Sequence, residues 1–191
     1  MRLFVALDLP DVVRQEFREL IARLKKDCPG ARWVRPEGIH VTLKFIGYTD
    51  DKNFDSICAA LAPVRPDQPV EMELRGLGFF PNERRPRVLF CEVEASASLA
   101  RLAGDIDGAL EPLGVARETR EFVPHLTLAR IEPGKISPGE VQKLVRTAQE
   151  LEGKGFGSTR ETEFYLFESI LKQTGAEYKR LRAFPCVKGS P

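Results

Sequence analysis

The chain has 191 residues, of which 42% are hydrophobic and 30% are charged, which is the usage of an ordinary soluble globular protein. This length can bury a sizeable core without disulfides or metals, and it excludes two full-sized domains. Because 29 basic side chains stand against 28 acidic ones, the net charge is +1 and any contact with nucleic acid must be local.

The first third of the chain predicts two strands and two helices. Residues 3–7 form an apolar run typical of a buried strand, and residues 11–24 follow with apolar positions at helical spacing. Residues 40–46 are apolar and β-branched and predict a central strand, with a helix after it at about residues 51–61. The run at 3–7 is too short for a signal sequence or a membrane span, so we expect a soluble, cytoplasmic protein that contacts no membrane.

The remaining elements mix strands and helices. Strands at residues 70–79 and 88–93 form a hairpin whose connection, residues 81–87, is rich in proline and arginine. A helix at 98–110, a strand at 122–131 and a helix at about 138–151 follow. Two last strands, at 163–171 and 177–184, are joined by residues 172–176. Hairpin connections among helical ones favour α+β layers over a doubly wound parallel sheet.

The four cysteines predict neither disulfides nor a metal site. Cys28, Cys58, Cys91 and Cys186 lie far apart, with no C-x-x-C pair and no nearby histidine. The chain also lacks H-E-x-x-H and H-x-H patterns, so two histidines leave a zinc shell incomplete. We expect reduced, mostly buried thiols and no bound metal.

Both histidines of the chain open the same pattern, H-x-T-L, at residues 40–43 and 125–128. With eight Thr and 21 Leu available, chance places T-L after both histidines in about two of 100,000 arrangements. The copies are 85 residues apart in a chain whose halves are about 95 residues long, which predicts two similar lobes from a duplication, each contributing one motif.

This pattern suits chemistry at phosphorus. On a strand, residues i and i+2 face the same way, so each histidine and its threonine project together. An imidazole titrates near neutral pH, so one histidine can act as a general base while the other acts as a general acid. A threonine hydroxyl can donate a hydrogen bond to a non-bridging phosphate oxygen. A single histidine on a strand is more often structural, but the shared pattern favours the functional interpretation.

The sequence resembles the two-histidine (2H) phosphoesterase superfamily, whose signature is a pair of H-x-T-x motifs. More closely, it is similar to the RNA 2',3'-cyclic phosphodiesterase family, also called 2'-5' RNA ligase-like proteins. The matching stretches are residues 2–7, 33–47 and 124–130, together with Glu168, Ser169, Gly175, Ala176 and Tyr178 near the end. The resemblance therefore covers nearly the whole chain.

The resemblance implies an α+β fold over residues 1–191: a single bilobal catalytic domain with two pseudo-twofold-related lobes. Each lobe would be a mainly antiparallel sheet backed by helices, with the active-site groove between them. The implied reaction is hydrolysis of a 2',3'-cyclic phosphate, at an RNA end or in a small cyclic nucleotide, to a 2'-phosphate. No metal or nucleotide cofactor is implied, and a monomer is expected.

The family pattern, carried over to this sequence, makes His40 the proton donor to the leaving O3' and His125 the proton acceptor that activates water. Thr42 and Thr127 would hold the phosphate oxygens. The nearly symmetric motifs give no independent way to decide which imidazole starts protonated, and reversal of the reaction exchanges the two roles.

Phe45 and Arg130 lie five residues after each histidine, and the resemblance implies contacts to the terminal nucleotide. A base can stack on either side chain. Strict alternation, however, puts position i+5 on the face opposite the histidine, so Phe45 belongs to the core unless the strand bends there.

Several arginines are candidates for contacts to RNA phosphates, although a solvated surface is the usual place for such charges. They are Arg84, Arg85 and Arg87 in the hairpin connection, and Arg32, Arg35, Arg117 and Arg120 before the two motifs. Tyr178 and Lys179 are further candidates.

Two alternatives remain open. The first is a ligase that joins RNA ends through a 2'-5' bond, and the second is a module that binds RNA ends without chemistry. Binding alone has no evident need for two matched titratable groups. Since water is far more abundant than a second RNA end, hydrolysis is the favoured direction.

Overall fold

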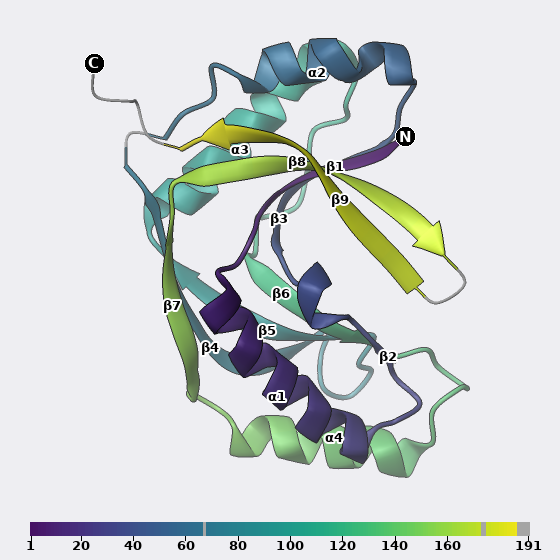
Figure 1. Cartoon of the computed structure of the whole chain (residues 1–191). Helices are drawn as coiled ribbons and strands as arrows, with labels where there is room; N and C mark the ends of the chain where they lie inside the picture. The colour runs from purple at the N-terminus through teal and green to yellow at the C-terminus, as the bar shows by residue number, and fades with distance from the viewer. Residues whose placement is uncertain (67, 173–174, 187–191) are drawn as a thin grey trace.

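The computed structural model describes residues 1–66, 68–172 and 175–186, and within them every strand pairing is antiparallel (Figure 1). The strands are β1 (Arg2–Leu7), β2 (Arg32–Trp33), β3 (Val41–Tyr48), β4 (Val70–Phe80), β5 (Val88–Ala95), β6 (His125–Arg130), β7 (Gly155–Glu161), β8 (Glu163–Lys172) and β9 (Gly175–Pro185). The helices are α1 (Asp11–Asp27), α2 (Phe54–Leu61), α3 (Ala97–Leu110) and α4 (Pro138–Glu150), and short 3-10 helices cover Pro36–Gly38, Asp51–Asn53 and Glu111–Leu113.

The sheet consists of two similar halves that meet at its centre. The strand order is β7-β4-β5-β6-β3-β1-β8-β9, with β2 added beside β6. Strands β3 and β6 share one paired position, Val41 with Leu126, so backbone pairing between the two halves of the sheet is short. Each half contains the same strand–helix–strand order, β1-α1-β3 in one and β5-α3-β6 in the other. The predicted pair of lobes is therefore confirmed.

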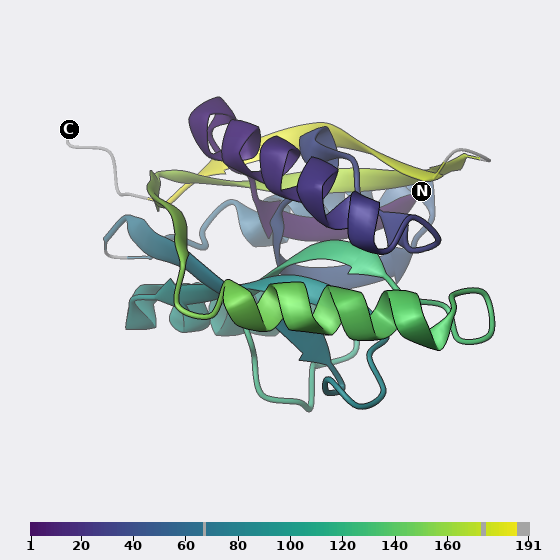
Figure 2. The ribbon, with the colours of Figure 1, turned by 90° about the horizontal axis from the view of Figure 1, so that it is seen from below.

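The helices pack as two pairs. Figures 1 and 2 show α1 and α4 side by side, and the two helices are in contact. Helices α2 and α3 contact each other at the other end of the molecule. Helix α4 begins with a capping box in which Ser137 and Glu140 satisfy each other's backbone N–H groups. Helix α1 ends at Asp27, two residues before Pro29 and Gly30, which do not favour continuation of a helix.

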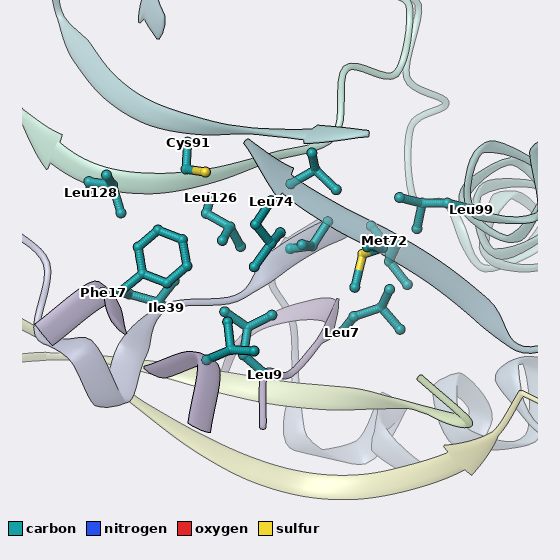
Figure 3. Packing of buried hydrophobic residues seen from close by; sticks show 14 of the residues in the cluster. Leu7, Leu9, Phe17, Ile39, Met72, Leu74, Cys91, Leu99, Leu126 and Leu128 are labelled. Atoms are coloured by element: carbon teal, nitrogen blue, oxygen red, sulfur yellow. The ribbon is translucent and has the colours of Figure 1, made fainter. Parts of the chain in front are cut away.

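One hydrophobic core joins both halves. Figure 3 shows Leu7 and Phe17 from the N-terminal part packed with Leu74, Leu126 and Leu128 from the other half. The leucines come from the inward face of the sheet, and Phe17 comes from the buried face of helix α1. The opposite face of β1 carries a separate cluster of Phe4, Ala6 and Phe167. The sheet therefore has one face in the core and one face left for a site.

A buried cation also ties the sheet to the helices. Lys44 of β3 is buried, forms an ion pair with Asp107 of α3, and donates a hydrogen bond to the carbonyl oxygen of Ala116 at 2.6 Å. Because a buried ammonium is costly unless it is paired, these partners explain why a lysine is tolerated in the middle of an apolar strand.

Most predicted elements are confirmed, with differences at the least apolar segments. The strand predicted at 122–131 is restricted to β6, and the start of the helix predicted at 51–61 is a 3-10 turn. Strand β7 and the two-residue strand β2 were not predicted. Strand β7 contains two glycines and few apolar residues, and its pairing with β4, not its own pattern, makes it a strand. Residues 173–174 of the predicted connection lie outside the described residues.

The four cysteines are free and buried, as predicted. Burial raises the pKa of every one of these thiols and takes that of Cys186 to about 12. A thiol with a raised pKa stays protonated near neutral pH and is a poor nucleophile.

Candidate functional site

The two H-x-T-L motifs meet at the centre of the sheet. Val41 and Leu126 are the paired residues of the antiparallel strands β3 and β6. Continuing this register by one residue in each direction places His40 opposite Thr127 and His125 opposite Thr42. Because cross-strand partners share one face of a sheet, each histidine faces the threonine of the other motif.

A β-bulge interrupts each motif at its leucine. On β1, Val5 and Ala6 pair with Lys44 and Thr42, so Leu43 is an extra residue in β3. On β5, Leu89 and Phe90 pair with Ala129 and Thr127, so Leu128 is the extra residue in β6. Leu43 is 6% exposed and Leu128 is fully buried, which means that both leucines turn into the core.

The bulges correct the expected position of Phe45. Phe4 and Ala6 lie on one face of β1, and their partners are Phe45 and Thr42, so Phe45 lies on the same face as Thr42. Phe45 is 64% exposed and is not a core residue. In the same way, Val88 and Phe90 lie on one face of β5 and pair with Arg130 and Thr127, so Arg130 lies on the same face as Thr127. Strict alternation fails because the extra leucine shifts the alternation by one residue.

Aromatic rings surround His40 on its side of the site. The centroid of its imidazole lies 4.7 Å from that of Phe4, 4.9 Å from Tyr178 and 6.0 Å from Phe167. These rings come from three different strands, β1, β8 and β9. Of these, only Tyr178 was a candidate from the sequence, since no local pattern marks the two phenylalanines as neighbours of a histidine.

His125 has a smaller aromatic neighbourhood. The rings of Phe80 and Phe90 lie edge-on to its imidazole, at centroid distances of 5.0 and 5.6 Å, and they stack on each other at 4.1 Å. Gly78 makes this stack possible, because a Cβ at that position would lie 2.6 Å from Cζ of Phe90. Glu92, also on β5, is the cross-strand partner of His125.

Both imidazoles are oriented by the same local bond. Nδ1 of His40 lies 2.8 Å from the carbonyl oxygen of Gly38, and Nδ1 of His125 lies 2.9 Å from that of Val123. A carbonyl oxygen only accepts hydrogen bonds, so Nδ1 is the donor in each ring. This leaves Nε2 of each histidine as the nitrogen that can give or take a proton.

The burial of His40 changes its acidity. Desolvation within the aromatic cluster lowers its pKa to about 4, while the bond to the Gly38 carbonyl opposes the shift. The charge of His125 adds a smaller lowering to this pKa. In the ligand-free protein, His40 is therefore neutral at neutral pH.

The loop before His40 is held by a buried arginine of α1. Nη1 of Arg14 donates to the carbonyl oxygens of Pro36, Glu37 and Ile39, at 3.2, 3.1 and 3.3 Å. These residues flank Gly38, whose carbonyl orients His40. The same guanidinium is paired with the buried carboxylate of Asp8.

Asp8 is shared with a second arginine, because its other oxygen pairs with Arg180 of β9. Asp8, Arg14, Arg180 and His40 are among the residues around a cavity of about 260 Å³ that adjoins the aromatic cluster. Among the described residues, the carbonyl of Val123 at the second histidine receives no comparable arginine, so the two halves differ here.

The remaining candidates are spread around these motifs. Thr42 and Thr127 are half-buried, and Arg130 and Lys179 are exposed. Three of the approach arginines already have acidic partners: Arg35 with Glu177, Arg117 with Glu111, and Arg120 with Glu118. Arg32 is exposed at the edge of the sheet in β2.

Residues 1–66, 68–172 and 175–186 contain neither a cluster of metal ligands nor a membrane-spanning helix. No group of three or more His, Cys, Asp and Glu side chains there could hold a metal ion. No helix in these segments is both long enough and apolar enough to cross a membrane.

A sheet of two similar halves, with an H-x-T motif from each half on one face, defines the class of two-histidine phosphoesterases. A family model described as LigT-like phosphoesterase matches the chain twice, over residues 7–90 and 91–178, and each match contains one motif. The chain belongs to this family.

Curated relatives with the name RNA 2',3'-cyclic phosphodiesterase are similar over most of their length. The protein of Archaeoglobus fulgidus is 35% identical over 184 residues, covering 96% of this chain and 99% of the relative. The protein of Thermotoga maritima is 31% identical, covering 95% of this chain and 93% of its own.

Solved structures show the same fold. TT0787 of Thermus thermophilus superposes with a TM-score of 0.78 at 28% identity, covering 99% of this chain and all of its own. LigT of Escherichia coli, crystallised with 3'-AMP, superposes with a TM-score of 0.75 at 24% identity, covering 98% of each chain.

Proposed function

We propose that this protein is an RNA 2',3'-cyclic phosphodiesterase, which hydrolyses a 2',3'-cyclic phosphate to a 2'-phosphate. The observation that carries this proposal is the antiparallel pairing of β3 and β6 at Val41 and Leu126, which sets each histidine opposite the threonine of the other motif. The curated relatives of this chain that cover most of its length carry the name of this activity.

The reaction is a displacement at phosphorus that is assisted by two proton transfers, one from the attacking water and one to the departing oxygen. His125 accepts a proton from water, and the water oxygen attacks phosphorus as the P–O3' bond breaks. His40 gives its proton to the departing O3', so the product carries a 2'-phosphate and a free 3'-hydroxyl. Thr42 and Thr127 donate hydrogen bonds to the non-bridging oxygens, where negative charge develops. Because the protein fixes both imidazoles beside the bound phosphate, the proton transfers occur within one complex and need no further encounter between molecules.

The lowered pKa of His40 is compatible with its role as donor once substrate is bound. A cyclic phosphate carries a negative charge, and an opposite charge within about 4 to 6 Å favours the protonated imidazole. Binding of the substrate therefore raises the pKa of His40 from its value of about 4. The negative charge of the bound substrate thus favours uptake of a proton from solvent by the histidine that acts as the acid.

We infer that Phe45 and Arg130 contact the terminal nucleotide. Both are exposed, and both lie on the face of the motif threonines as a result of the bulges. A base can stack on the ring of Phe45 or on the planar guanidinium of Arg130. The partner is accordingly an RNA with a cyclic phosphate end, or a small cyclic nucleotide. We further propose a monomer that works in the cytoplasm without a cofactor.

The experiment that tests the proposal is analysis of phosphate ends. A short RNA that ends in a 2',3'-cyclic phosphate is incubated with the protein in EDTA, without ATP, and the products are separated by end type. We expect a 2'-phosphate product with the wild-type protein. His40→Ala and His125→Ala should each lower the rate by roughly 10² to 10⁴.

Circular dichroism and thermal unfolding serve as the control that both variants fold. Unchanged turnover in a folded variant would contradict the two-histidine mechanism, and loss of turnover in EDTA would contradict a metal-independent one. A product in which two RNA ends are joined by a 2'-5' bond would favour the ligase instead.

A further inference from the structure

A second and larger cavity lies outside the histidine site. It is a groove of about 720 Å³ between the β4–β5 connection and helix α4. Arg84, Arg85 and Arg87 border it on one side and Arg146 of α4 on the other, and we refer to it as the arginine groove. Ile131, Val141 and Val145 provide apolar surface between these charges. The groove therefore combines a basic rim with an apolar floor.

The four arginines have no acidic partners in the part of the chain that the structure describes, since no salt bridge there involves Arg84, Arg85, Arg87 or Arg146. The two acidic residues of the lining are already engaged. Glu83 accepts a hydrogen bond from Gln149 at 2.8 Å, and Glu132 is paired with Lys135 at 2.5 Å. Because the lining holds four arginines and two glutamates, one of which is paired with Lys135, positive charge is in excess and the groove attracts anions.

Strand β6 connects this groove to the candidate active site. The strand begins with His125 and carries Arg130 on the site face, paired with Val88. The next residue, Ile131, lies on the opposite, core face and lines the groove, so the two sites meet around the end of this strand. The N–H of Ile131 donates to the carbonyl oxygen of Arg87 at 2.8 Å, which fixes the arginine connection to the end of β6. At about 3.3 Å per residue, His125 and Ile131 are roughly 20 Å apart along the strand.

We propose that the arginine groove binds the RNA strand that leads to the cyclic phosphate. The inference rests on the proposed function, and it adds that the protein favours polynucleotide ends over nucleoside cyclic phosphates. Phosphates along the strand contact the four arginines, and Arg130 bridges the groove and the histidine site. Sugar and base faces pack on the apolar floor.

A strand of RNA fits these observations better than an acidic peptide does. RNA carries one negative charge per nucleotide at regular spacing, and arginines lie both in the groove and at Arg130 on the way to the histidines. The RNA end that reacts at the histidines is attached to its own strand, so an RNA that occupies the groove can also reach the histidine site. An acidic peptide has no corresponding reason to extend along β6.

The test compares substrates of two lengths on charge-reversed variants. The substrates are cytidine 2',3'-cyclic phosphate and an unstructured RNA of twelve nucleotides that ends in the same group. The variant is Arg84→Glu with Arg146→Glu. The control is Lys52→Glu with Arg65→Glu, which makes the same change in charge at exposed positions beside α2.

For the wild-type protein, we expect kcat/KM to be higher on the long RNA and to fall steeply with salt. In the groove variant, kcat/KM on the long RNA should fall at least tenfold. The slope of log kcat/KM against log salt concentration should become less steep by about 1.4, which is roughly 0.7 for each phosphate contact that is lost. Turnover of the cyclic nucleotide should stay within twofold, and the control should resemble the wild type on both substrates.

Equal loss on both substrates, or an unchanged rate and salt slope on the long RNA, would overturn the proposal. If the groove variant loses binding of a twelve-residue acidic peptide while RNA turnover is unchanged, the groove binds protein instead.

If the wild type turns over neither substrate, the proposed function fails. Fluorescence anisotropy with the same RNA then still tests the groove. Weaker binding by the groove variant than by the control supports the groove, and equal binding overturns it.

Discussion

Leu43 and Leu128 occupy equivalent β-bulges, each three residues after a histidine and directly after the motif threonine. Each leucine turns into the core and shifts the alternation of its strand by one residue. As a result, Phe45 and Arg130 share a face with Thr42 and Thr127. The fourth residue of the motif thus has a geometric role, because it determines which side chains of the strand reach the site.

This geometry predicts that Phe45→Ala changes the free energy of unfolding by less than about 1 kcal/mol, since surface substitutions have small effects. The same change at fully buried Phe17 should cost about 3 to 5 kcal/mol. If Phe45 stacks on the terminal base, KM for an RNA end rises in the variant. Urea unfolding and steady-state kinetics measure both quantities, and a destabilisation like that of Phe17→Ala would contradict the bulge.

Thr42→Val and Thr127→Val remove a hydroxyl and keep the shape of the side chain. Each should lower the rate of hydrolysis roughly 10 to 100-fold, because each removes one neutral donor to a phosphate oxygen. Thr→Ser at the same positions keeps the donor and should retain most of the rate. A serine variant as slow as the valine variant would indicate that the methyl group matters and not the hydroxyl.

The roles of the two histidines can be separated with a substrate whose O3' is replaced by sulfur. A thiolate leaves without protonation far more readily than an alkoxide, because a thiol is much the stronger acid. His40→Ala should therefore lose much less rate on the sulfur substrate than on the oxygen substrate. His125→Ala should lose the same on both, since water must still be activated. The opposite pattern would exchange acid and base.

Titration of His40 provides a test without catalysis. Proton NMR of the ligand-free protein should report a pKa of about 4, and a bound nucleoside 2'-phosphate should raise it by roughly 1 to 3 units. A free pKa near 6.5 would show that the aromatic cluster does not desolvate the ring.

The same shift affects stability. His40 binds its proton near pH 6.5 in the unfolded chain but only near pH 4 in the folded one, so the free energy of unfolding decreases as the pH falls through this window. The decrease should be smaller in His40→Gln, which cannot bind a proton. Urea unfolding at a series of pH values measures this difference.

Arg14 is expected to position His40 without touching substrate. Arg14→Lys keeps a cation but has one nitrogen in place of two, so it cannot both pair with Asp8, as Nη2 does, and donate to the carbonyls around Gly38, as Nη1 does. We expect a lower kcat, little change in KM, and a changed His40 titration. Arg18→Lys is the matched control, since Arg18 is exposed and binds the same loop only through Glu37, at 3.0 Å. Wild-type kcat and titration in Arg14→Lys would contradict this role.

The local pattern of the sequence was sufficient for most elements and for the two motifs. Apolar patterning predicted α1, β3 and the β4–β5 hairpin, because each buries most of its apolar residues in the core. It did not predict β7, whose residues pair with β4 although few of them are apolar. The repeated H-x-T-L pattern indicated the site because only two histidines are present.

Only the tertiary structure decided which residues surround those motifs. Phe4 reaches His40 from the first strand of the chain, Phe167 and Tyr178 reach it from the last two, and Arg14 reaches its loop from a helix. Such contacts depend on strand order and on bulges, which arise from pairing between distant segments and leave no local periodicity. The sequence by itself determined the two repeated motifs that predict the reacting groups, whereas the packing of the two halves decided the orientation and burial of their side chains and the acidity of His40.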